Sequence, residues 1–276
     1  MIATSYWLLL GYINLAKGNL VALDEINAHL SKIRKDYNFI HAELDFYEHS
    51  AHAMLNRGKI AKAIELAEAG DKLADKHDDQ VRRLSFLGII VKSQAKRNNY
   101  DTVSDLIDIA DEVLDIVGKD TVTPYFYVSY LNAKSLFNIY LLESHKSSLK
   151  SVKTKDILSG AKAIVSENVK YSAKRSAYNR VEAYGYMAKY LRMTKKYGKA
   201  LKYYDKAIKE GERLGANLEL SRVYVEVGKF LLSGELKQKG YNGITPEGYF
   251  QNGKSMFEEM GLKWDLEQLD IFLSSI

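Results

Sequence analysis

The residues best suited to metal chemistry lie between positions 45 and 52, where two histidines and two acidic residues fall close together. A helix would place them near one another as Asp45, Glu48, His49 and His52. Imidazole and carboxylate groups are ligands that zinc accepts. A zinc-hydrolase helix has two histidines four residues apart with a glutamate between them, whereas these histidines are three apart. The spacing favours a polar patch at the rim of a groove, and we predict no metal site.

A second motif could bind phosphate, because Gly248 to Ser255 (GYFQNGKS) has a glycine, four residues and then Gly-Lys-Ser. A working phosphate loop follows a buried apolar strand, and the fold also supplies an aspartate that holds magnesium. The preceding stretch, Lys237 to Glu247, is polar and interrupted by glycine and proline. We therefore predict that the motif lies in an insertion leading into the last repeat helix. No nucleotide or other cofactor is expected.

No other combination of residue types points to catalysis, and we predict that the protein is not an enzyme. The 276 residues include no cysteine, which excludes disulfides, thiol nucleophiles and thiolate metal sites and fits a reducing compartment. The apolar run from Ile2 to Leu10 is too short to span a bilayer and lacks a basic leader. We predict a cytoplasmic protein with no membrane contact. A helix that starts so close to Met1 suggests a segment of a longer polypeptide.

The elements that position these residues are predicted to be helices. Apolar residues make up 46% of the chain, enough for a substantial core, and only two prolines occur, Pro124 and Pro246. Strand-like alternation of apolar and polar residues is hard to find. The composition predicts an all-α protein with short polar turns.

A pattern of small and large residues recurs before four candidate turns at Gly18, Gly58, Asn98 and Lys195. A small or modest residue stands seven positions before each turn: Gly11, Ala51, Val91 and Ala188. A large residue stands eleven positions before: Trp7, Tyr47, Leu87 and Tyr184. Small residues also recur five, nine and twelve positions after a turn, as in Ala63, Ala67 and Gly70. Helices approach closely where side chains are small, so the pattern predicts stacked helix pairs.

These positions resemble the tetratricopeptide repeat, most closely between Tyr184 and Ala207 (YGYMAKYLRMTKKYGKALKYYDKA). Successive units are 40 residues apart where the spacing can be counted, against 34 in the standard repeat. Such long repeats are similar to those of bacterial signalling proteins, including transcription regulators and peptide-sensing receptors. HEAT repeats have a similar length and are the structural alternative, although they do not predict a glycine turn followed by alanine at the fifth position.

The resemblance implies an all-α, superhelical solenoid of about six helix pairs plus a C-terminal helix, within a single domain over residues 1–276. The repeats are expected at residues 3–36, 41–77, 80–117, 122–168, 173–214 and 217–261, and the last helix at 263–274. Between Thr121 and Lys170 the pattern does not fix the register. A glycine-rich insertion from Gly234 to Gly248 is expected to separate the two helices of the sixth repeat.

A solenoid of this kind binds its ligand on the concave face, which the resemblance places on the first helix of each pair. The repeat register puts ten residues there: Tyr12, His52, Asn56, Lys92, Lys96, Tyr186, Lys189, Arg192, Arg222 and Lys229. The implied groove has mixed charge near the N-terminus and is cationic towards the C-terminus. The resemblance thus implies a non-catalytic scaffold, a regulatory or sensor module, that binds a protein or peptide segment, with an acidic segment favoured.

Charge is distributed unevenly along the chain and leaves two alternative functions open. The segment from Lys146 to Lys209 holds seventeen basic and four acidic residues, a net of +13, although the whole chain carries only +5. This segment could bind nucleic acid, but it contains no recognisable nucleic-acid-binding motif, so nucleic acid is not the favoured partner. Alternatively, the apolar residues from Trp7 to Leu10 could form an interface in a homo-oligomer.

Overall fold

The computed structural model describes residues 2–144, 152–236 and 238–276, and these residues form thirteen helices with no strand among them. In chain order the helices are α1 (Ile2–Lys17), α2 (Leu20–Tyr37), α3 (Ile40–Asn56), α4 (Ile60–Lys76), α5 (Gln80–Lys96), α6 (Tyr100–Val117), α7 (Pro124–Ser144), α8 (Val152–Arg175), α9 (Arg180–Met193), α10 (Tyr197–Leu214), α11 (Asn217–Leu232), α12 (Pro246–Met260) and α13 (Lys263–Ser274).

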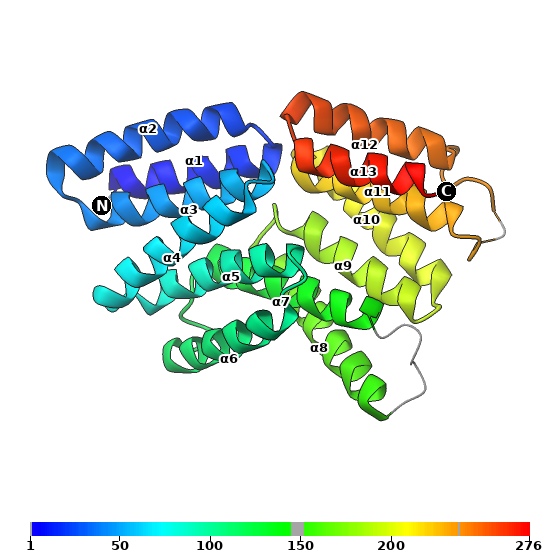
Figure 1. The fold of residues 1–276 in the computed structure, drawn as a ribbon, viewed down its shortest axis with the longest axis horizontal. Helices are drawn as coiled ribbons and strands as arrows, with labels where there is room; N and C mark the ends of the chain where they lie inside the picture. Colours follow the sequence, from blue (N-terminus) through cyan, green and yellow to red (C-terminus); the bar gives the residue numbers. More distant parts are fainter. Residues whose placement is uncertain (1, 145–151, 237) are drawn as a thin grey trace.

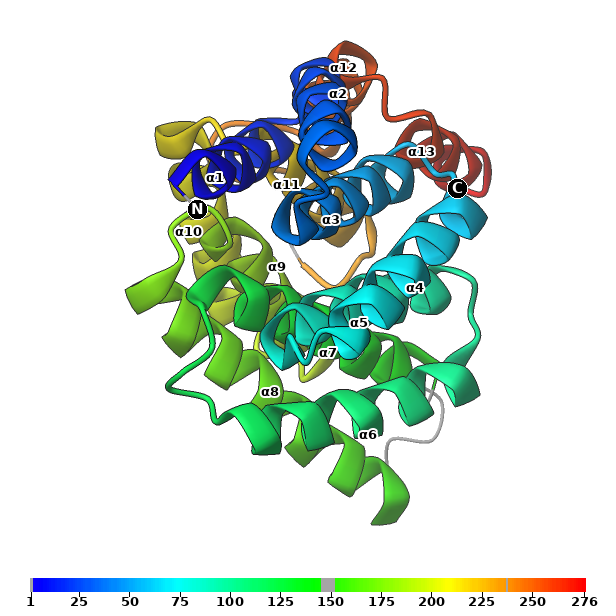
Figure 2. The same ribbon diagram turned by 90° about the vertical axis from the view of Figure 1, so that its left-hand side faces the viewer.

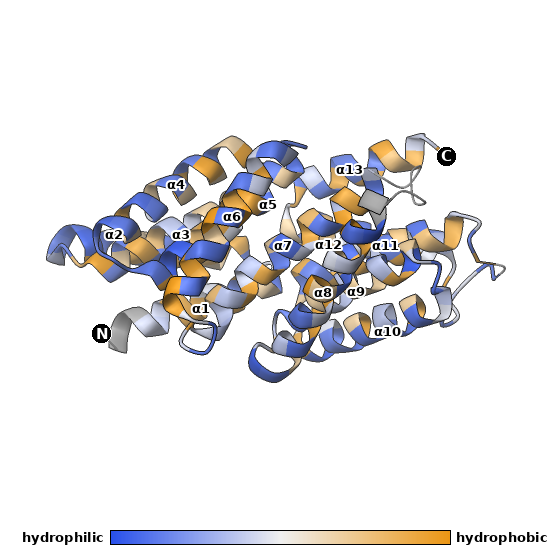
Figure 3. Cartoon of the chain, turned by 90° about the horizontal axis from the view of Figure 1, so that it is seen from below, coloured by the Kyte–Doolittle hydropathy of each residue, from blue (hydrophilic) through white to orange (hydrophobic). Residues whose placement is uncertain are grey.

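The helices form six pairs, from α1 with α2 to α11 with α12, followed by the single helix α13. Neighbouring pairs pack on one another in chain order (Figure 1). The predicted all-α solenoid of about six helix pairs and a C-terminal helix is therefore confirmed. Seen from below, the outer edge of α10 is largely hydrophilic, whereas apolar residues gather between the helices (Figure 3).

Two of the expected repeat bounds are wrong. Helix α8 continues to Arg175, beyond the expected end at 168, and α9 begins at Arg180 rather than near 173. The connection between them (residues 176–179) has no glycine, so nothing in the repeat pattern marked it. Residues 145–151 of the expected fourth repeat lie outside the described part of the chain.

The four candidate turn residues do end the first helices of their pairs. Gly18, Gly58, Asn98 and Lys195 all have positive φ, between 59° and 75°. At each turn, the next residue's N–H donates to a carbonyl five residues earlier; at Lys59 the acceptor is the carbonyl of Met54, at 2.9 Å. Such bonds satisfy carbonyls that the last helical turn leaves without partners, and a residue with positive φ makes them possible.

The small positions of the repeat are sites of close packing. Ala51 and Ala188 are fully buried. Gly11 and Gly70 have no room for a side chain, because a Cβ atom would lie 2.2 Å from the His49 ring in the first case and 2.3 Å from the Phe86 ring in the second. These contacts explain why small residues recur at these positions.

The two ends of the solenoid meet, as Figures 1 and 2 show from two sides. The Gly18 turn packs on Met260 at the end of α12, and the Gly58 turn packs on Trp264 of α13. Helix α1 also packs on α11. One apolar cluster joins residues of both ends: Leu15, Leu20, Leu218, Val225, Phe257 and Leu269. The first helices therefore surround a central space instead of lining an open groove.

Candidate functional site

A cavity of about 960 Å³ lies between the first helices of the pairs. Residues of α1, α3, α5, α7, α9 and α11 line it, together with one face of α13. The second helices contribute only Arg175, Tyr204 and Phe257 among the described residues. The first helix of every pair thus faces the cavity, which is the placement expected for the concave side of a solenoid.

All ten residues predicted to bind a partner line this one cavity. They are Tyr12, His52, Asn56, Lys92, Lys96, Tyr186, Lys189, Arg192, Arg222 and Lys229. They come from five helices, α1, α3, α5, α9 and α11. The structure brings the predicted set together; that this set binds a partner stays a prediction.

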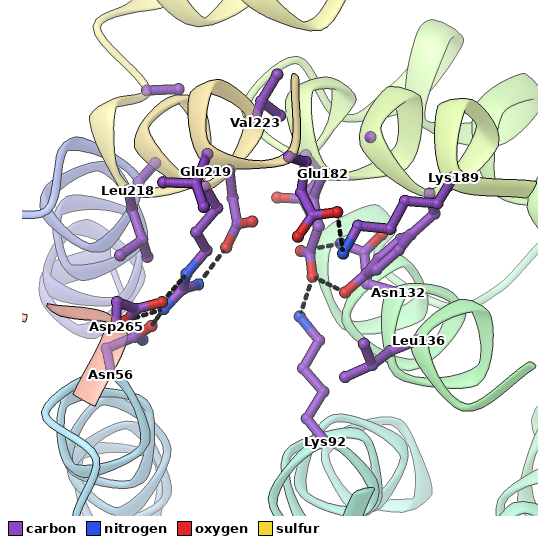
Figure 4. Close-up of a pocket in the computed structure, with 18 of the residues that line it drawn as sticks. Asn56, Lys92, Asn132, Leu136, Glu182, Lys189, Leu218, Glu219, Val223 and Asp265 are labelled. Carbon is purple, nitrogen blue, oxygen red and sulfur yellow. Dashed lines mark hydrogen bonds and ion pairs between the residues drawn. The ribbon is translucent and has the colours of Figure 1, made fainter. Parts of the chain in front are cut away.

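Three polar side chains donate hydrogen bonds to the carboxylate of Glu182 on α9, at one wall of the cavity (Figure 4). The Nζ atom of Lys92 lies 2.6 Å from its Oε1 atom, and the Tyr186 hydroxyl donates to the same oxygen at 2.7 Å. The amide of Asn132 donates to Oε2 at 2.6 Å. Lys92 and Tyr186 are therefore held in place by a carboxylate that the sequence analysis did not assign to the site.

Three more of the predicted bases on α9 and α11 also have carboxylate partners. Lys189 and Lys229 share Glu226, at 3.3 Å and 3.7 Å, and Arg192 lies 2.8 Å from Glu235. Glu226 keeps a low pKa although it is buried, because the two lysines stabilise its charged form. The charge of these bases is thus largely balanced within the wall.

The seam between the two ends of the chain is held by Arg222. Its guanidinium donates to both carboxylate oxygens of Asp265 on α13, at 2.9 Å and 3.1 Å. It also donates to Glu219 at 2.6 Å and to the side-chain oxygen of Asn56 on α3 at 2.9 Å. One side chain thereby connects α3, α11 and α13 (Figure 4).

The cavity is consequently of mixed charge throughout, whereas the sequence predicted that it becomes cationic towards the C-terminus. Seven basic and five acidic side chains line it. Among the six predicted basic residues, Lys96 alone has no carboxylate partner within the described part of the chain. Its Nζ atom lies 4.0 Å from the ring centre of Trp264, and burial together with the charge of Arg222 lowers the pKa of Lys96 to about 8. Of these six bases, Lys96 is thus the one whose charge is balanced by an aromatic ring and not by a paired carboxylate.

The polar patch expected at the groove rim is instead a buried network. Asp45, Glu48 and His49 are fully buried. Arg82 of α5 forms ion pairs with Asp45 and, at 3.6 Å, with Glu48. Asp45, Glu48 and His49 were misplaced because the two carboxylates have a buried arginine partner, which lies outside the repeat signature, whereas His52 does line the cavity. Across residues 2–144, 152–236 and 238–276, no cluster of three or more metal-binding side chains has the arrangement of a metal site.

Tyr12 connects this network to the cavity. Its hydroxyl donates to Glu48, and burial raises the pKa of Tyr12, so the hydroxyl keeps its proton. Its ring lies 5.0 Å from the ring of Tyr125 across the cavity wall. Tyr12 therefore offers a ligand its aromatic face and not its hydroxyl.

Helix α7 contributes a row of cavity residues that the sequence analysis missed. They recur three or four positions apart: Tyr125, Ser129, Asn132, Leu136, Tyr140 and Glu143. This spacing is a readable signal for one helix face. It could not be assigned to the cavity because no recognisable turn residue fixed the register of this repeat.

The phosphate-loop motif does not form a loop, and four lysines of the basic segment lie away from the cavity. Gly248 to Ser255 lies inside α12, so the motif is helical and not part of a loop or of the insertion. Lys195, Lys196, Lys199 and Lys202 line a separate hollow at the start of α10. In the part of the chain that the structure describes, no helix combines the length and apolarity needed to cross a bilayer.

The geometry defines a class of protein, an all-α solenoid with a central cavity. A comparison of the sequence with models of known protein families finds no match, and neither does a comparison with curated proteins.

Buried His52 gives the stability of the fold a pH dependence. Burial, with the charge of Lys92, lowers its pKa from 6.5 to about 3. Unfolded His52 takes up a proton below about pH 6.5 and folded His52 does not, so its contribution to stability is present above pH 6.5 and is lost as the pH falls. Asp45, whose pKa burial raises to about 7, acts in the opposite direction, because its folded form retains the proton.

We expect His52→Gln to reduce the loss of unfolding free energy between pH 7 and pH 5 by about 2 kcal/mol. Asp45→Asn should increase that loss, because it removes the opposing group. Urea unfolding followed by circular dichroism at both pH values measures the two effects. A His52→Gln profile parallel to that of the wild type would show that this imidazole is not buried in its neutral form.

Proposed function

We propose that this chain is a tetratricopeptide-type scaffold whose central cavity binds a peptide segment of a partner without converting it chemically. The observation that carries the proposal is the convergence of the ten predicted residues on one cavity. Apolar and aromatic side chains there surround a few fixed polar groups, as is usual in pockets that bury a ligand and orient it. Such a module suits a regulatory or sensor role in a signalling protein.

The size and charge of the cavity restrict the partner. Its volume, about 960 Å³, is at the upper end of the range of roughly 300–1,000 Å³ found for ligand pockets. A short segment fits such a space and a folded domain does not. Most of the bases are paired, so the ligand gains little from bulk charge, and an acidic group would gain most beside Lys96 or Arg175, which have no carboxylate partner among the described residues.

Filling the cavity tests the proposal. Gly185 of α9 lines the cavity, and a Cβ atom there would meet only Val223, at 3.5 Å, which is an ordinary contact. The ring of Gly185→Phe must therefore extend into the cavity. Peptides selected on the wild type from a random display library should bind this variant at least about tenfold more weakly, a loss of about 1.4 kcal/mol, as measured by fluorescence anisotropy.

Gly198→Phe is the matched control, because Gly198 also lies in a helix but a Cβ atom there would meet nothing within 4 Å. It should leave peptide binding unchanged. Full affinity in Gly185→Phe would exclude the cavity as the binding site. The same pair separates the nucleic-acid alternative, which rests on the basic segment from Lys146 to Lys209. Labelled DNA bound by the lysines of this segment at the start of α10 would be insensitive to Gly185→Phe.

A further inference from the structure

Helix α13 lies in the seam between the two ends of the solenoid and presents one face to the cavity. The residues of that face are Trp264, Asp265, Gln268, Leu269 and Phe272, spaced as a single helical stripe. On the other side, Ile271 is 64% exposed. The backbone of α13 packs less closely on α12 than the two helices of any pair pack on each other. Much of the attachment of α13 to the rest of the fold therefore comes from its side chains that reach into the seam.

The polar anchor of α13 is Asp265. This carboxylate is only 7% exposed and accepts two hydrogen bonds from Arg222, whose guanidinium also reaches Asn56. Arg222, with Lys96 nearby, lowers the pKa of Asp265 despite its burial. A two-point arginine–carboxylate contact of this kind fixes both the position and the direction of the group it holds.

The apolar anchors of α13 lie on either side of Asp265 along the stripe. Trp264 packs against the Gly58 turn, with its ring over Lys96. Leu269 is 1% exposed, and the Phe272 ring lies 5.0 Å from the Nζ atom of Lys229. The stripe thus offers an aromatic residue, an acid and then two apolar residues one and two turns further on. It matches a groove built from α3, α5, α11 and α12, where the Phe250 ring lies 5.9 Å from that of Phe272.

Four of the ten predicted binding residues, Asn56, Lys96, Arg222 and Lys229, are therefore already engaged around α13. We propose that this part of the cavity is a helix-binding groove, that α13 is its internal ligand, and that the partner segment is an amphipathic helix of the same chemistry. The inference rests on the proposed function and narrows it from any peptide to this class. Helix α13 and the partner would compete for one groove.

A synthetic, fluorescently labelled peptide of residues 263–276 tests the proposal without knowledge of the natural partner. In the full-length chain, Trp264→Ala with Asp265→Asn weakens the attachment of the resident helix. This variant should bind the peptide at least about tenfold more tightly than the wild type does, by fluorescence anisotropy. Addition of Arg222→Met should remove the gain. A peptide that carries the same two substitutions as the variant is the control and should not bind.

No binding of the peptide to a double variant with unchanged helix content would overturn the proposal, and so would equal affinity for the variant and the wild type. Asp265→Asn alone, expected to give a smaller gain, replaces the double variant if that fails to fold. Failure of the proposed function and failure of this inference can be told apart. Gly185→Phe with library peptides tests whether the cavity binds peptides at all, whereas the 263–276 peptide tests whether α13 can be exchanged.

Discussion

Replacement of Arg82 by methionine is expected to lower the free energy of unfolding by about 3–5 kcal/mol. Arg82 is 7% exposed, and its guanidinium lies between the fully buried carboxylates of Asp45 and Glu48. Burial raises the pKa of Asp45 to about 7 even with the arginine present. Without it, two acidic groups would lack a counter-charge in a site closed to water. Urea unfolding at pH 7.5, followed by circular dichroism, measures the loss.

The next residue along α5 provides a matched control. Arg83 also pairs with two aspartates, Asp71 at 3.1 Å and Asp75 at 2.8 Å, but these carboxylates are 20% and 58% exposed and keep their contact with water. Arg83→Met should therefore lower stability by less than about 1 kcal/mol. Asp45→Asn should restore part of the stability of Arg82→Met, because it removes one of the two buried acidic groups that the arginine pairs with. Equal losses for the two arginine variants would show that the buried network does not stabilise the contact between α3 and α5.

Replacement of Arg222 by methionine is expected to lower the free energy of unfolding by about 2–3 kcal/mol. The substitution leaves the carboxylate of Asp265 without its two hydrogen bonds in a position that is only 7% exposed. The loss is smaller than for Arg82, because the side chain of Arg222 faces the cavity and is 23% exposed. It should be concentrated at the seam, so that the amides of α13 exchange with deuterium faster than those of α5.

Arg213→Met is the control for this variant. Arg213 pairs with Glu210 of its own helix at 2.6 Å on the exposed side of α10. Its replacement should change neither stability nor exchange in α13. If Arg222→Met left exchange in α13 at the wild-type rate, the closure of the solenoid would depend on apolar packing alone.

The fold could be predicted from sequence because its determinants are local. A positive φ at Gly18 and Gly58, and the close approach of a neighbour at Gly11 and Gly70, each restrict the residue at one position. These restrictions recur with the repeat and so leave a pattern. The same register then placed the ten cavity residues on the correct helices.

The charge of the cavity could not be predicted because it depends on pairs that are distant in the sequence. Lys92 meets Glu182, and Arg222 meets both Asn56 and Asp265. Repeat positions assign a base to the inner face but say nothing about the acid opposite it. Closure of the two ends is a distant contact of the same kind, and it converts the expected groove into a cavity.

An engineered disulfide can show whether the ends of the solenoid meet and close the first helices around one cavity. The chain has no cysteine of its own. A Cβ atom at Gly18 would lie 3.6 Å from the Cβ of Met260, within the range of about 3.5–4.5 Å that a disulfide requires. Gly118, another turn glycine with positive φ, has only Thr121 near its Cβ position and serves as the control partner.

Mass spectrometry and maleimide labelling of the folded protein after mild oxidation give the result. We expect an intramolecular disulfide in Gly18→Cys/Met260→Cys and two free thiols in Gly118→Cys/Met260→Cys. Two free thiols in the first variant, with its helix content intact, would contradict the closed arrangement.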